Sequence, residues 1–261
     1  MTDALLPDTV GPASVAGPRR LAWQVATVAE IVEETWRVRT LALDVPGWSG
    51  HRAGQHLDIR LTSEDGYQAQ RSYSIASAPG NPRLEITVER IEEGEVSPYL
   101  ARDVQVGDKF ELRGPIGGYF VWTEAVGGPL FLIAGGSGVA PLMAMLRHRA
   151  IVGSKVPATL LYSSRTAQDI IYRAELDALA ARGGGLRIVH TLTRGAPPGW
   201  AGYSRRIDAA MLAETCFPAA ERPKSFICGP TSLVESASRT LVELGHDVRL
   251  VKTERFGPTG G

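Results

Sequence analysis

The sequence predicts two domains, an antiparallel β-barrel followed by an α/β domain with a parallel sheet. Up to about residue 122, short alternating apolar segments recur every ~8–12 residues between Gly, Pro, Asp and Asn, as in barrels and sandwiches. Beyond residue 128, continuous apolar segments alternate with amphipathic ones, which is typical of a parallel sheet with helices on both faces. The 261 residues are enough for two domains. We assign 1–20 to a flexible arm, 21–124 to the barrel, 125–253 to the α/β domain and 254–261 to a tail.

The barrel strands are expected where β-branched and aromatic residues alternate with polar ones. In chain order these segments are 23–32, 40–45, 55–61, 71–77, 84–91 and 109–122. One helical segment is expected at 96–103, "VSPYLARD", where a serine precedes a proline as at a helix start.

The second domain is expected to add its elements in strand–helix pairs. The predicted strands are 129–135, 158–165, 186–193, 225–230 and 248–256. The predicted helices are 141–153, 167–182, 206–215 and 231–245.

Composition excludes several functional classes. Lys plus Arg equals Asp plus Glu at 28 each, so no basic field favours nucleic acid. The first twenty residues lack the apolar core of a signal peptide, and no apolar run approaches the ~20 residues of a membrane helix, so we expect a cytoplasmic protein. Two cysteines and five histidines without ligand spacing predict neither an iron–sulfur cluster nor another metal site.

The segment "RSYSIAS", 71–77, carries hydroxyls and an arginine at a density that folding does not require. One interpretation is a solvated strand face. The other is a platform for a planar ligand that carries phosphate, and the rest of the chain has to decide between them.

The second domain opens with "LIAGGSGVAPL", in which a buried strand runs into Gly135, Gly136 and Gly138 before a helix. Glycines allow the backbone to approach a pyrophosphate, and a helix N-terminus favours anions. Pro141 stands where the last glycine of G-x-G-x-x-G is usual, so a tight turn without a ligand remains the alternative.

Residues after later strands favour NADP over NAD. The second strand of this domain ends in Ser163, Ser164 and Arg165 rather than in the acid that binds an NAD ribose. Arg194 and the pair Arg205–Arg206 follow later strand ends, and a guanidinium can bind a 2′-phosphate through two parallel hydrogen bonds.

"CGP", 228–230, lies at another strand-to-helix junction. Its strand end should open on the same crevice as the glycine turn, with Cys228 facing the reactive end of the dinucleotide. Cys216 has no such context and is interpreted as structural.

Together these residues resemble the ferredoxin–NADP⁺ reductase family of flavoproteins over about residues 21–256, here without an iron–sulfur domain. Arg71, Tyr73 and Ser74 match the family's R-x-Y-S, and Gly94–Ser97 match its G-x-x-S; "GGSGVAP" and "CGP" follow in the family's order. The resemblance implies a flavin-binding barrel and a nucleotide-binding α/β domain. It implies that FAD is bound by Arg71, Ser72, Tyr73, Ser74, Val88, Arg90, Gly94, Val96, Ser97 and Phe256. It implies that NADPH is bound by Gly136, Ser137, Gly138, Ser164, Arg165, Arg194, Arg206, Cys228, Gly229 and Pro230.

The resemblance also implies individual roles. Arg71 would pair with the flavin pyrophosphate, and the presence of such a pyrophosphate site favours FAD over FMN. Tyr73 would stack on the flavin ring. The catalytic residues would be Ser74, Cys228, Glu254 and Phe256: Ser74 near flavin N5, Glu254 as a proton relay or fixed charge, and Phe256 over the second flavin face. Core packing remains the alternative for Phe256, and the tail "GPTGG" could cover the adenine.

The implied function is an NADPH oxidoreductase, expected to be monomeric, that passes electrons to a separate ferredoxin, flavodoxin or partner oxidoreductase. The alternatives are a free flavin or quinone reductase with a diffusible acceptor, and a non-catalytic flavin electron-transfer subunit.

Overall fold

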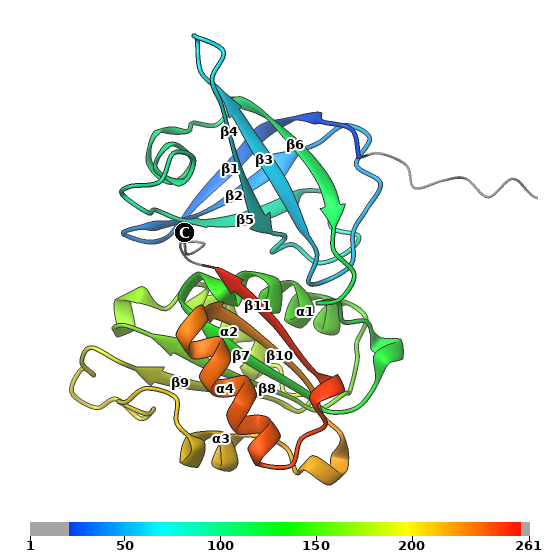
Figure 1. Cartoon of the computed structure of the whole chain (residues 1–261), viewed down its shortest axis with the longest axis vertical. Coiled ribbons are helices and arrows are strands. Elements are labelled where there is room, and N and C mark those ends of the chain that lie inside the picture. The colour runs from blue at the N-terminus through cyan, green and yellow to red at the C-terminus, as the bar shows by residue number, and fades with distance from the viewer. Residues whose placement is uncertain (1–20, 257–261) are drawn as a thin grey trace, which may run out of the picture.

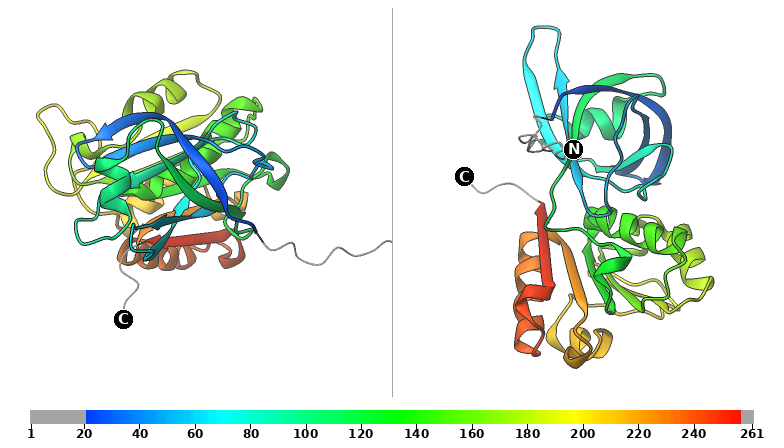
Figure 2. Two further views of the ribbon diagram at one scale, coloured as in Figure 1. Left: turned by 90° about the horizontal axis from the view of Figure 1, so that it is seen from above. Right: turned by 90° about the vertical axis from the view of Figure 1, so that its right-hand side faces the viewer.

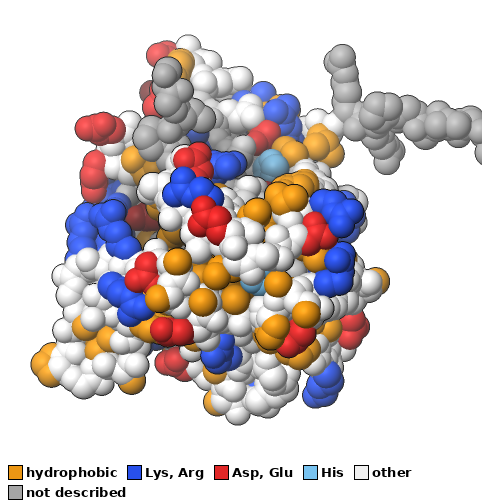
Figure 3. All heavy atoms as spheres, turned by 60° about the horizontal axis from the view of Figure 1, so that its bottom comes forward, with side chains coloured by type: hydrophobic (Ala, Val, Ile, Leu, Met, Phe, Trp, Pro, Cys, Tyr) orange, Lys and Arg blue, Asp and Glu red, His pale blue; other side chains and the backbone are white. Residues whose placement is uncertain are grey.

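The computed structural model describes residues 21–256, which form two domains stacked one above the other (Figure 1). The predicted arm, 1–20, and the last five residues of the predicted tail, 257–261, lie outside the described residues. Within 21–256, no helix has the length and apolar character needed to cross a membrane. On the face drawn in Figure 3, acidic and basic side chains are interspersed, in keeping with the balanced composition.

The first domain is a six-stranded antiparallel barrel, as predicted. Its strands in the order of the sheet are β4 (Gln68–Ser74), β3 (His56–Thr62), β6 (Lys109–Ile116), β1 (Gln24–Thr35), β2 (Val38–Asp44) and β5 (Leu84–Glu89). The chain beyond β4 closes the barrel, because Ile75 bridges Ile86 and the Ala76 amide donates to the Glu85 carbonyl at 2.8 Å. Residues 97–103 are helical, close to the predicted 96–103.

The second domain is a five-stranded parallel sheet, also as predicted. The order is β11 (Val251–Phe256), β10 (Lys224–Pro230), β7 (Leu130–Gly135), β8 (Ala158–Ser164) and β9 (Leu186–Leu192). Helices α1 (Val139–Ile151) and α2 (Arg173–Ala181) cover one face, and α3 (Ala209–Thr215) and α4 (Thr231–Glu243) cover the other (Figure 2). Every residue of β7 is buried because it lies between these two layers. The strand order reverses between β7 and β10, and ligands bind at the carboxyl edge of such a switch point.

The predicted helix over 167–182 is wrong in its first third. Only Ala167–Asp169 form a short turn, and α2 begins at Arg173 because Tyr172 has a left-handed backbone with φ 58°. Two contacts of Tyr172 explain this break. Its hydroxyl contacts Thr87 of the barrel, and its backbone amide donates to the Glu34 carboxylate at 3.1 Å. Contacts between the domains therefore override the local preference for helix.

One apolar cluster is shared by the two domains. Its nucleotide-domain members come from β7, β8, β9, β10, α1, α2 and the segment 167–172 that precedes α2. The residues that the barrel and its following linker contribute are Val38, Ala53, Ala76, Phe120 and Trp122. A continuous cluster of buried side chains is what holds a single core together, so the two domains are expected to be rigidly docked.

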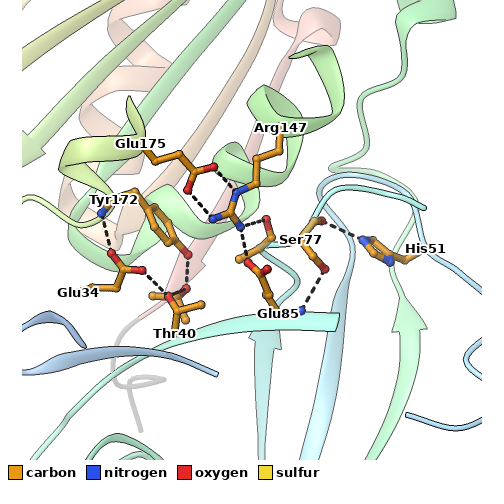
Figure 4. Close-up of polar contacts among 10 residues, drawn as sticks. Glu34, Thr40, His51, Ser77, Glu85, Arg147, Tyr172 and Glu175 are labelled. Atoms are coloured by element: carbon orange, nitrogen blue, oxygen red, sulfur yellow. Dashed lines mark hydrogen bonds and ion pairs between the residues drawn. The ribbon is translucent and has the colours of Figure 1, made fainter. Parts of the chain in front are cut away.

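A network of polar contacts also joins the two domains and is drawn in Figure 4. Arg147 of α1 lies at its centre. Its guanidinium donates to Glu85 of β5 at 2.7 Å, to the Ala76 carbonyl at 2.9 Å, and through two bonds to Glu175 of α2 at 2.8 and 2.7 Å. Arg147 thus joins the barrel, just beyond β4, to two helices of the nucleotide domain.

Candidate active site

The glycine turn and the "CGP" segment meet at the switch point between β7 and β10. A Cβ on Gly138 would lie 2.3 Å from the Cys228 carbonyl oxygen, and one on Gly229 would lie 3.1 Å from the Gly135 nitrogen. The two turns therefore pack backbone against backbone, at a distance that only glycine permits. The sequence-predicted nucleotide residues Gly136, Ser137, Gly138, Cys228, Gly229 and Pro230 are all brought together here.

The glycine turn is held from both domains. Gly136 has φ +54°, and its carbonyl accepts a hydrogen bond from the Tyr162 hydroxyl at 3.1 Å. The Ser137 hydroxyl donates to the Glu89 carboxylate at the end of β5 at 2.8 Å. Helix α1 has no acidic residue in its first turn and no side-chain cap of its own. The Glu89 carboxylate thus places a negative charge where the sequence predicts a phosphate.

Strand β11 places the predicted catalytic residues beside Cys228. Glu254 is the register partner of Cys228 in the parallel pair β10–β11, and Phe256 is the partner of Pro230. Cys228 is 3% exposed, and burial, with a smaller contribution from the charge of Glu254, raises the pKa of its thiol. Phe256 packs against the shared apolar cluster, so both its predicted stacking role and the alternative of core packing remain open.

Burial also raises the pKa of Glu254 from its ordinary 4.5 to about 7. A carboxyl with this pKa takes up and releases its proton near neutral pH, as the predicted proton relay requires.

The raised pKa of Glu254 predicts a pH-dependent stability. A folded pKa of about 7 above an unfolded value near 4.5 means that the folded state binds the extra proton. The contribution of Glu254 to stability therefore decreases as the pH rises from about 4.5 to about 7, and the loss is at most about 3 kcal/mol since one pKa unit is 1.36 kcal/mol. We expect Glu254→Gln to be more stable than the wild type at pH 8.5, with a smaller advantage at pH 5. Urea denaturation at both pH values measures this.

The control for this prediction is Glu64→Gln, which removes a carboxylate from an exposed turn. Its stability relative to the wild type should be the same at both pH values. An equal pH dependence for the Glu254 and Glu64 variants would contradict the raised pKa of Glu254.

Of the basic residues predicted for the 2′-phosphate, Arg165 and Arg194 follow the ends of β8 and β9, and the pair Arg205–Arg206 lies in the connection after β9. The Arg194 amide donates to the Arg165 carbonyl at 2.8 Å, which holds the two strand ends together. Ser164 is buried, and its hydroxyl has no hydrogen-bond partner among the described residues. Arg205, the neighbour of Arg206, is paired with Asp208 at 2.6 Å.

A groove of about 660 Å³ lies beside β9 in the same part of the domain. Its polar and aromatic lining residues are Arg173, Arg187, His190, Trp200 and Tyr203. The Tyr203 ring also lies 4.8 Å from the Arg205 guanidinium. The groove therefore borders the loop that carries Arg205 and Arg206.

On the barrel, the R-x-Y-S residues lie on two faces of β4. Because side chains alternate along a strand, Arg71 and Tyr73 share one face, and Ser72 and Ser74 share the other. Arg71 donates to the Glu95 carboxylate at 2.7 Å, in a pair whose side chains are 52% and 46% exposed. Tyr73 packs against the barrel core, and burial raises the pKa of its hydroxyl. The Ser72 hydroxyl donates to Asp58 at 2.7 Å, so its oxygen can only accept, not donate, in the predicted cofactor contact. Ser74 ends β4 and is half-buried.

The G-x-x-S segment forms a closed turn. The Gly94 amide donates to the Ile91 carbonyl at 2.9 Å, and the Ser97 hydroxyl accepts from the Ile91 amide at 3.2 Å. A Cβ on Gly94 would lie 2.9 Å from the Ser97 hydroxyl, so a larger residue there would displace that hydroxyl. Val96 in this turn is fully buried.

Val88 and Arg90 flank Glu89 at the end of β5. The Val88 side chain is fully buried, so only its backbone is available for the predicted cofactor contact. The Arg90 amide donates to the Arg37 carbonyl at 2.9 Å, and its guanidinium lies 5.7 Å from the exposed Trp36 ring.

Both predicted phosphate-binding groups already hold a carboxylate of the chain, Glu95 at Arg71 and Glu89 at Ser137. The donor chemistry therefore fits anionic oxygens at both positions, as FAD and a pyridine dinucleotide require. Sequence reasoning missed Glu89, Glu95 and Arg147. No local pattern marks them, because their partners are 48, 24 and 62 positions away along the chain.

Comparison with known proteins agrees with this geometry. Residues 25–121 match the family described as oxidoreductase FAD-binding domain, and residues 132–239 match the oxidoreductase NAD-binding domain. Ferredoxin–NADP reductase B of Sorangium cellulosum is 36% identical over 212 residues, which are 78% of this chain and 84% of that protein.

Two further relatives extend the comparison. The glycine betaine monooxygenase reductase subunit of Chromohalobacter salexigens is 33% identical over 88% of this chain, and the chain spans 63% of the length of that relative. The FAD/NAD-binding domain of nitric oxide dioxygenase from Vibrio cholerae has the same fold, with a TM-score of 0.80 and 26% identity over 90% of this chain and 99% of that one.

Proposed function

Since the chain belongs to the ferredoxin–NADP⁺ reductase-like family of oxidoreductases with FAD-binding and NAD-binding domains, we propose that it oxidises NADPH and passes the electrons to a separate acceptor protein. The observation that carries the proposal is the junction of the two domains. Ala76, two residues beyond Ser74, lies in the same apolar cluster as Cys228 and the adjoining Phe256. The end of the R-x-Y-S strand and the nicotinamide end of the predicted crevice therefore share one packed environment.

The bound flavin supplies the hydride-accepting chemistry. The chain's residues position it: Arg71 would hold its pyrophosphate, Tyr73 would stack on its ring, and Ser74 would donate a hydrogen bond near N5. On the nucleotide side, the backbone of the glycine turn would hold the dinucleotide pyrophosphate, and Cys228 would border the nicotinamide. Such positioning contributes on the order of 7–11 kcal/mol to a reaction between two bound groups.

The preference for NADPH over NADH rests on Arg165, Arg194 and Arg206. These residues belong to the ends of β8 and β9 and to the connection after β9, where the 2′-phosphate would lie. The identity of the acceptor as a ferredoxin, a flavodoxin or a partner oxidoreductase is supported by the names of the relatives, which are reductase subunits and ferredoxin reductases.

The test is an anaerobic titration that follows flavin absorption as NADPH or NADH is added. We expect NADPH to bleach the flavin at lower concentration than NADH does. Arg165→Ala should weaken NADPH by roughly 10- to 150-fold, the equivalent of the 1.5–3 kcal/mol typical of a hydrogen bond to a charged group, and should leave NADH nearly unchanged.

Three results would count against parts of this proposal. A yellow protein that neither nucleotide bleaches would favour a non-catalytic electron-transfer subunit. Equal effects of Arg165→Ala on both nucleotides would remove Arg165 from the phosphate site. Turnover with free flavin or a quinone, but with no ferredoxin or flavodoxin, would favour a diffusible acceptor.

A further inference from the structure

Glu89 is a barrel residue that contacts the nucleotide-binding turn. It ends β5, and its two carboxylate oxygens have different partners. One accepts from the Ser137 hydroxyl at 2.8 Å, and the other lies 3.2 Å from the Arg37 guanidinium. The first oxygen would also lie 3.7 Å from a Cβ on Gly136, so the carboxylate sits directly over the turn.

The contact between Glu89 and Ser137 places a negative charge where the negatively charged pyrophosphate of the dinucleotide must lie. A pyrophosphate at this turn would need the free amides at the start of α1 and the Ser137 hydroxyl. Glu89 uses that hydroxyl and adds like charge beside the site. It also neutralises Arg37, whose Nε atom is buried and has no hydrogen-bond partner among the described residues.

We propose that Glu89 is a built-in competitor for the pyrophosphate of the dinucleotide and thereby sets the affinity of the chain for it. This inference rests on the proposed function, since it concerns the same nucleotide site. When the dinucleotide binds, the Glu89–Ser137 hydrogen bond breaks and Ser137 becomes available to the ligand. Glu89 therefore determines how tightly the nucleotide is held and acts through the turn rather than on the reacting atoms.

The test is calorimetric titration of the purified FAD-loaded chain with NADP⁺, which binds without turnover. Glu89→Gln keeps the shape of the side chain but removes its charge and frees Arg37. We expect the variant to bind NADP⁺ roughly tenfold more tightly at low salt, the order of effect that one like charge exerts across several ångströms at a partly exposed site. The ratio should fall toward one at about 1 M salt, where the Debye length is about 3 Å.

Two controls separate this effect from a general change of charge or of fold. Glu93→Gln removes an equal charge from the same segment, at an exposed side chain, and should bind NADP⁺ as the wild type does. The fragment 2′-AMP carries the 2′-phosphate without the pyrophosphate, so its affinity should be the same in the wild type and in Glu89→Gln.

The possible outcomes distinguish the inference from the proposed function. Unchanged or weaker NADP⁺ binding by Glu89→Gln, with 2′-AMP still bound, would overturn the competitor role and leave the proposed function standing. A weaker affinity would instead indicate that Glu89 accepts hydrogen bonds from the ligand. If the wild type and the variant bind neither NADP⁺ nor 2′-AMP, the proposed function fails and the inference fails with it.

Discussion

Replacing Arg147 with methionine is expected to lower the free energy of unfolding by about 3 kcal/mol, the lower end of the cost of removing one partner from a buried ion pair. The Arg147 side chain is 15% exposed and pairs with both Glu85 and Glu175. Burial opposes its charge, but the hydrogen bonds to Glu175 and the nearby carboxylates hold the pKa of the guanidinium above its ordinary value. Without it, two carboxylates would face each other at the domain interface. Urea denaturation followed by tryptophan fluorescence measures the loss.

A matched substitution and a rescue make this prediction specific. Arg239→Met removes a guanidinium that is 73% exposed and lies 3.9 Å from Glu243, and it should cost less than about 1 kcal/mol. Adding Glu85→Gln and Glu175→Gln to Arg147→Met should restore part of the stability, because it removes the unpaired charges. Similar losses for Arg147→Met and Arg239→Met would show that the interface network contributes little.

The second large effect is expected from Gly138→Ala. Its Cβ would lie 2.3 Å from the Cys228 carbonyl oxygen and 2.8 Å from the Gly229 nitrogen, both backbone atoms, so α1 and β10 must move apart. The variant should still bind FAD, because all the predicted flavin contacts except Phe256 lie in the barrel. We expect the NADPH concentration that half-bleaches the flavin to rise by about tenfold or more, since displacements of about 1 Å can cost on the order of 100-fold in such sites.

Gly118→Ala provides the comparison for this variant. The nearest atom to its new Cβ, Arg52 Nη2, is 3.6 Å away, an ordinary contact, so NADPH titration should match the wild type. If the flavin of Gly138→Ala is half-bleached at the same NADPH concentration as in the wild type, the close approach of the two turns is not needed for binding.

The sequence predicted the strands well because their signals are local. The period of two in the barrel and the continuous apolar segments of the parallel sheet place the strands within three residues of their observed ranges, with one exception. The last barrel strand was predicted over 109–122, but β6 ends at Ile116. The segment 167–182 has a helical pattern of apolar residues, yet Tyr172 interrupts it with φ 58°. That interruption depends on Thr87 and Glu34, which lie 85 and 138 positions away, so no local pattern could reveal it.

The candidate site divides in the same way. The glycine turn and "CGP" were predictable because each is a short motif at a strand end, and the fold necessarily brings the ends of β7 and β10 together. The carboxylates that contact Ser137 and Arg71 were not predictable. Glu89 is one of many acidic residues in the sequence, and only the docking of the two domains places it at Ser137.

The shared apolar cluster means that the domain boundary in the sequence is not a boundary in the packing. Phe120 and Trp122, at the end of the first domain, and Ala53 and Ala76, within it, are buried among residues of α1 and β10. In a chimaera that joins this barrel to the nucleotide domain of a distant relative, the shared cluster would therefore contain residues from two proteins that did not evolve to pack together. Recombination at the linker can yield a well-packed protein only when these interface residues are exchanged together with the domain against which they pack.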